Sequence, residues 1–69
     1  MRTNWFIIFE ARRAWWIDNE GTEFGPFETR ELAGAEALSI ARSFGDKTRR
    51  SQVFWPEDDG RQKMIWEGV

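Results

Sequence analysis

Few residues of this 69-residue chain could carry out chemistry. The chain has no His and no Cys, so it lacks the commonest general base, the thiol nucleophile and the thiolate ligands of zinc. The segment 57–60 places three carboxylates before a glycine, but the alternating ligands and distal Glu of a calcium-binding loop do not follow. We interpret this segment as a solvated turn and expect no metal or cofactor site.

The other nucleophiles lack an activating partner. Ser39, Ser43 and Ser51 have no histidine to accept their protons, and Lys47 and Lys63 lie in polar segments rather than in the apolar surroundings of a catalytic lysine. A glycine-rich phosphate loop is also missing, and so small a chain has little room for an enclosed pocket. We therefore predict a protein without enzymatic activity.

Composition limits the class of partner. Ten Lys+Arg against twelve Asp+Glu give a net charge of −2, which argues against general affinity for phosphate backbones. The longest apolar run, residues 5–9, is too short for a membrane span or a signal peptide, so we expect a cytoplasmic protein. At 41% hydrophobic, with five Trp and six Phe, the chain is too apolar for a disordered segment, and we expect a single domain over residues 1–69.

The elements that would position these residues follow from periodicity and turn chemistry. Helical spacing of apolar residues predicts a helix over 30–44, with Thr29 as its N-cap and Gly45 at its C-terminal cap position. Runs of β-branched and aromatic residues predict strands at 5–9, 14–18, 22–27, 52–55 and 62–67.

The order of these elements predicts the fold class. Two or three strands, one helix and a final hairpin (β-β-(β)-α-β-β) indicate an α+β domain, with an antiparallel sheet of four to five strands and the helix on one face. Asp59-Gly60 favours a tight turn in the last hairpin, whereas the connection at Arg12-Arg13 has no Gly and leaves its turn type open.

Both faces of this sheet carry apolar residues. Side chains alternate between the faces of a strand, yet Trp5 and Ile7 on one face are as apolar as Phe6 and Ile8 on the other. A single helix covers only one face, and large exposed apolar patches mark binding sites. A one-residue change of register exchanges the faces, so two alternative sets could line the contact. These are Phe6, Ile8, Trp16, Phe54 and Ile65, or Trp5, Trp15, Trp55 and Trp66.

Three interpretations of the second face stay open. Sheet twist and the long arms of Arg12, Arg13 and Arg61 could cover it; the chain could form a homodimer; or the face could hold another protein, a ligand or a nucleic acid. We expect a self-associating or protein-binding module. Nucleic-acid binding is the alternative, disfavoured by the net charge and by abundant glutamates. Its candidate residues are Arg12, Arg13, Lys47, Arg49 and Arg50.

Three short motifs carry a resemblance to a known family. They are a Trp16-Ile17 strand with a Gly21 turn, Gly25-Pro26-Phe27-Glu28-Thr29 leading into a helix with Ala33 and Ala37, and Asp59-Gly60-Arg61 in a hairpin. Over roughly residues 14–66 the chain resembles the small bacterial proteins of domain of unknown function 2188, a resemblance that implies this order of elements and no known activity. The strand-to-helix portion is also similar to the arm-binding domains of phage integrases, which implies DNA recognition by the sheet through Arg12 and Arg13.

Overall fold

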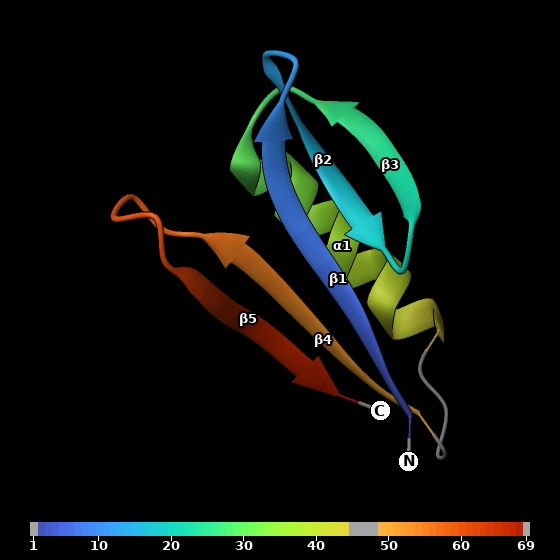
Figure 1. Ribbon diagram of the computed structural model, residues 1–69. Helices are drawn as coiled ribbons and strands as arrows, with labels where there is room; N and C mark the ends of the chain where they lie inside the picture. The colour runs from blue at the N-terminus through green and yellow to red at the C-terminus, as the bar shows by residue number, and fades with distance from the viewer. Residues whose placement is uncertain (1, 45–48, 69) are drawn as a thin grey trace.

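A five-stranded sheet with one helix on one face forms the structure (Figure 1). The computed structural model describes residues 2–44 and 49–68. The predicted α+β class is confirmed, and the third strand is present. In chain order the elements are β1 (Arg2–Ala11), β2 (Ala14–Asn19), β3 (Thr22–Phe27), α1 (Arg30–Phe44), β4 (Arg49–Pro56) and β5 (Gln62–Gly68).

The sheet is mixed, so the expectation of a purely antiparallel sheet was wrong for its central pair. The strand order is β3-β2-β1-β4-β5, and β1 pairs with β4 in parallel while every other pair is antiparallel. β3 runs in the same direction as β1, and α1 then carries the chain back along the sheet (Figure 1). β4 therefore starts beside the start of β1 and runs parallel to it, as a helical crossover allows.

The helix begins as the sequence predicts. The backbone N–H of Leu32 donates to Oγ1 of Thr29 at 3.0 Å, and the N–H of Ala33 donates to the Thr29 carbonyl at 3.1 Å. These bonds satisfy N–H groups that have no partner within the helix, so Thr29 is the N-cap. The predicted bounds 30–44 are confirmed, whereas Gly45 lies outside the described residues.

The core combines a helix face of small residues with large side chains from the sheet. The buried helix residues are Ala33, Gly34, Ala37 and Ala41. They pack against Phe6, Ile8, Ile17 and Val53. Because the helix residues are small, the helix backbone approaches the sheet closely, and the sheet supplies most of the buried apolar volume.

The β1–β2 turn, which the sequence left open, has two left-handed residues. Arg12 has φ 53° and Arg13 has φ 60°, and Ala11 pairs with Ala14 across the hairpin. Positive φ at both central residues is the geometry of a two-residue type I′ turn, which usually contains Asn and Gly. An arginine in this conformation costs about 1–2 kcal/mol, so the hairpin forms against a local backbone penalty.

The strand β4 starts earlier than the sequence indicates. Arg49 and Arg50, expected in a polar connection, are already paired with β1. The early part of β4 escapes a search for apolar runs because its buried residue, Ser51, is polar. Ser51 pairs with Asn4 of β1, which is also polar and buried. The rest of the expected connection, residues 46–48, lies outside the described residues.

Candidate interaction surface and an adjoining pocket

The sheet face away from α1 carries an apolar surface. Phe6 and Ile8 are fully buried on the side of the helix, so Trp5, Ile7 and Phe9 project from the opposite side of β1. Ser51 and Val53 are likewise buried under α1, which places Phe54 on the same uncovered side. The strand alternation therefore brings side chains from the two central strands together on the uncovered side.

Register extends this surface across four strands. Phe9 pairs with Trp16 of β2, Ile7 lies beside Phe54 of β4, and Phe54 pairs with Met64 of β5. Trp5 and Met64 expose 52% and 44% of their surface, and the remaining members are half-buried. We call this surface the open face. It consists of Trp5, Ile7, Phe9, Trp16, Phe54 and Met64.

A chain of polar contacts borders the open face at one end. Nε1 of Trp5 donates to Oε1 of Gln52 at 3.0 Å, and Nε2 of Gln52 donates to Oε2 of Glu67 at 2.7 Å. Arg50 lies 3.4 Å from the same carboxylate. The hydrogen bond from Gln52, followed by the charge of Arg50, lowers the pKa of Glu67 from its ordinary value of 4.5. The exposed indole of Trp5 is thus held in place by neighbours on β4 and β5.

An arginine covers part of the open face at the other end. The guanidinium of Arg12 lies 4.3 Å from the centroid of the Trp16 ring and 3.2 Å from Oε1 of Glu23. Nε1 of Trp16 donates to the Ala11 carbonyl at 2.8 Å. Arg61, by contrast, is 3.8 Å from Asp59 of its own turn. Of the arms considered as covers, that of Arg12 reaches Trp16, whereas Trp5 and Met64 stay exposed.

The open face is a mixture of the two sets expected from the sequence. Trp16 and Phe54 of the first set lie on it, but Phe6 and Ile8 are fully buried in the core and Ile65 packs on the helix side. Of the alternative set, Trp5 lies on the open face, while Trp15, Trp55 and Trp66 pack against the core. The first set was wrong to place Phe6 and Trp16 on one face. The two-residue β1–β2 turn pairs Trp16 with Phe9, so Trp16 lies on the face of Phe9 and not on that of Phe6. A two-residue loop assumed at Arg12-Arg13 would have revealed this pairing.

The arginines considered for nucleic acid do not form one surface. Arg12 and Arg13 lie at the end of β1, whereas Arg49 and Arg50 pair with residues at its start. Arg12 is paired with Glu23, and Arg50 with Glu67.

Arg49 is held by structural contacts. It donates to Oδ1 of Asn4 and lies 3.9 Å from Glu20. Lys47 lies outside the described residues. The candidate arginines are therefore separated along the sheet, and three of them are matched by carboxylates.

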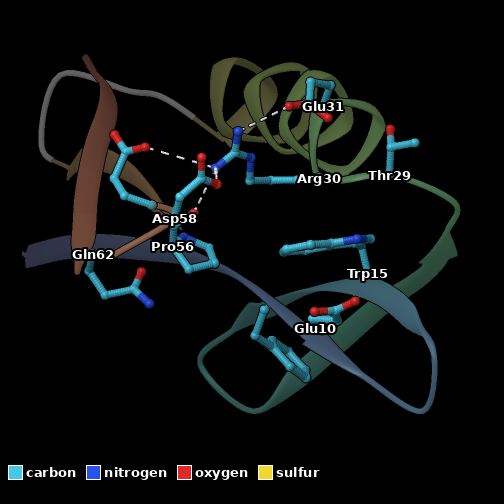
Figure 2. A pocket seen from close by; sticks show the side chains of 10 residues that line it. Glu10, Trp15, Thr29, Arg30, Glu31, Pro56, Asp58 and Gln62 are labelled. Carbon is cyan, nitrogen blue, oxygen red and sulfur yellow. Dashed lines mark hydrogen bonds and ion pairs between the residues drawn. The ribbon is translucent and has the colours of Figure 1, made fainter. Parts of the chain in front are cut away.

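A pocket of about 630 Å³ opens where the two central strands separate (Figure 2). The pairing of β1 with β4 ends at Ile7 and Phe54, after which β1 continues with β2 and β4 continues with β5. The two hairpins diverge in Figure 1, and the start of α1 lies behind them. The lining residues are Phe9, Glu10, Trp15, Thr29, Arg30, Glu31, Pro56, Glu57, Asp58 and Gln62. Sequence reasoning missed this pocket, because it arises from the separation of strands distant in the chain.

Arg30 joins the two sides of the pocket. Its guanidinium lies 4.4 Å from the centroid of the Trp55 ring and donates to the Pro56 carbonyl at 2.9 Å. It also donates to Glu31 at 3.2 Å and approaches Glu57 and Asp58 at 3.8 and 3.9 Å. Glu31 has a pKa below 4.5, because of a hydrogen bond from its own backbone and then the bond from Arg30. Arg30 thus ties the helix start to the β4–β5 turn.

Comparison with models of protein families, with curated proteins and with solved structures found no match to this chain. The resemblance to domain of unknown function 2188 therefore stays a prediction. Among residues 2–44 and 49–68, no group of three or more acidic side chains is placed to hold a metal ion. Within the same residues, α1 is neither long nor apolar enough to cross a membrane.

Proposed function

We propose that this protein is a non-enzymatic interaction module that associates with a second copy of itself through the open face. The observation that carries the proposal is the contiguity of six apolar side chains on the side of the sheet that α1 does not cover. Burying this surface against a matching surface removes apolar area from water, which is the main driving force of association.

Charge at the two ends of the open face favours a second copy as the occupant. One end carries Arg12 with Glu23, and the other carries Arg50 with Glu67. A two-fold axis lying in the face can bring an arginine of one copy opposite a glutamate of the other, so the surface is self-complementary. A polyanion would instead meet a carboxylate beside each of these arginines, which argues for the protein partner.

The dimensions of the molecule suit a dimer contact. The chain measures 36 × 22 Å along its two longer axes. These lengths set an upper limit for the area of the open face, and this limit is comparable to the ~800 Å² that each partner contributes to a standard protein interface. The apolar centre and charged ends also match the usual arrangement of an apolar core within a polar rim.

Sedimentation velocity over a concentration series tests the proposal. We expect the sedimentation coefficient to rise with concentration from that of a monomer to that of a dimer. Trp5→Ser should shift this transition to higher concentration, whereas Leu32→Ser should leave it unchanged. Leu32 is a matched control because it exposes 53% of its surface, against 52% for Trp5, and lies on α1 rather than on the open face.

Two results would contradict the proposal. A monomer throughout the concentration range would remove self-association. Equal effects of Trp5→Ser and Leu32→Ser would show that association, if present, does not use the open face.

A further inference from the structure

A guanidinium stacked on an indole and paired with a carboxylate occurs twice in this chain. Arg12 lies over Trp16 and pairs with Glu23, and Arg30 lies over Trp55 and pairs with Glu31. Each arrangement combines the attraction of a cation to an aromatic face with an ion pair. The chain therefore contains two examples of how an indole and a carboxylate together hold an organic cation.

A third indole and carboxylate face the pocket. Trp15 and Glu10 are directly paired across β2 and β1, so their side chains lie next to each other on the same side of the sheet. Both line the pocket, as Figure 2 shows, with Pro56 and Asp58 across from them. Among the described residues, no arginine or lysine stacks on Trp15 or pairs with Glu10.

The charge of the pocket favours a cation. Four carboxylates line it against the single guanidinium of Arg30. Glu31, Glu57 and Asp58 lie within 3.9 Å of that guanidinium, so Glu10 is the lining carboxylate for which no ion pair is found among the described residues. Lys63 reaches Glu57 at 3.6 Å but is not part of the lining. Phe9, Trp15 and Pro56 add apolar surface, which suits a ligand with a hydrocarbon part and excludes a strongly hydrated anion.

We propose that this pocket binds an organic cation, a guanidinium or alkylammonium group on a short apolar stem, placed against the Trp15 indole and paired with Glu10. The same group can belong to a free small molecule or to the side chain of a peptide. The two residues proposed to hold the cation, Glu10 and Trp15, lie on the helix side of the sheet and are not part of the open face, although Phe9 belongs both to the pocket lining and to the open face.

Titration followed by the indole N–H signals of the isotope-labelled full chain tests the proposal. The signal of Trp15 is assigned with Trp15→Phe, and the probe is butylguanidinium, with the neutral butylurea as its matched control. We expect butylguanidinium to shift the Trp15 signal in a saturable manner and butylurea to leave it in place. A blocked Gly-Arg-Gly peptide is the second probe. If the peptide also shifts the Trp15 signal, the natural ligand is a protein side chain. If butylguanidinium shifts the signal and the peptide does not, the natural ligand is a small molecule.

Charge removal then tests the role of Glu10. Glu10→Gln should weaken binding of butylguanidinium by up to about fivefold, the upper end of the range expected for an exposed ion pair. Glu36→Gln is the matched control, because Glu36 is an exposed carboxylate of α1 outside the pocket lining. This variant should leave the affinity for butylguanidinium unchanged. Equal shifts with butylurea, no shift with butylguanidinium, or equal affinities of the two variants would overturn the proposal.

Discussion

Gly34, in the middle of α1, packs directly on the indole of Trp55. A Cβ atom at Gly34 would lie 3.0 Å from the Trp55 ring, closer than ordinary van der Waals contact. The glycine is unfavourable for the helix by itself, by about 1 kcal/mol relative to Ala. Its presence allows a large aromatic side chain of β4 to lie beneath the helix backbone, where Arg30 stacks on the same ring. The contact therefore links the helix position, the core and the pocket.

We expect Gly34→Val to destabilise the fold by about 2–3 kcal/mol, because the branched side chain must displace the Trp55 ring in a packed core. Urea unfolding followed by tryptophan fluorescence measures the change. Ala35→Val is the matched control, since Ala35 is exposed on the same helix and the change there costs only helix propensity, below ~1 kcal/mol. Equal losses for the two variants would show that the Trp55 contact does not limit the side chain at position 34.

A second glycine shapes the end of the open face. Gly25 has φ 140°, and a Cβ there would lie 3.0 Å from both the Trp15 carbonyl oxygen and the Trp16 ring. We expect Gly25→Ala to cost more than Gly21→Ala, by about 1–3 kcal/mol, the range for overpacking. Gly21 is the control because its φ is also positive, at 96°, but a Cβ there meets nothing within 4 Å. Thermal unfolding of both variants measures the difference, and a larger loss for Gly21→Ala would contradict the contact with Trp16.

The two left-handed arginines of the β1–β2 turn differ in their contacts. Arg12 stacks on Trp16 and pairs with Glu23, whereas these contacts do not involve Arg13. We expect Arg13→Gly to stabilise the fold by about 1 kcal/mol, because glycine adopts positive φ without a Cβ penalty. Arg12→Gly should be close to neutral, since relief of the backbone is offset by loss of the two contacts. Urea midpoints of the two variants give the comparison; destabilisation by Arg13→Gly would mean that its side chain has a structural partner.

The lowered pKa of Glu67 predicts a pH dependence of stability. A carboxyl group with a lower pKa in the folded protein than in the unfolded chain contributes stability above the unfolded value, near 4.5, and this contribution disappears as the pH falls through the folded value. We expect wild type to be more stable than Glu67→Gln at neutral pH, with the difference shrinking on acidification below 4.5. Urea unfolding as a function of pH measures it.

Gln52 supplies the control for this dependence, because its hydrogen bond is the largest cause of the shift. In a Gln52→Leu background, the effect of Glu67→Gln should be smaller and should depend less on pH. An undiminished effect in that background would contradict the role given to Gln52.

Local signals were enough to predict most of the elements. The helix bounds, the Thr29 cap and the existence of the strands depend on residues within a few positions of one another, so the sequence indicates them directly. The apolar character of both sheet faces is also readable from the alternation along β1.

Tertiary structure alone decided which residues meet. The parallel pairing of β1 with β4 joins Asn4 to Ser51 and places Phe54 beside Ile7 on the open face. The pocket exists because β1 and β4 separate after Ile7 and Phe54 and pair with different neighbours. Strand order and register are set by contacts between residues far apart in the chain, and a shift of one residue moves a side chain to the other face, so patterns within single segments could not determine them.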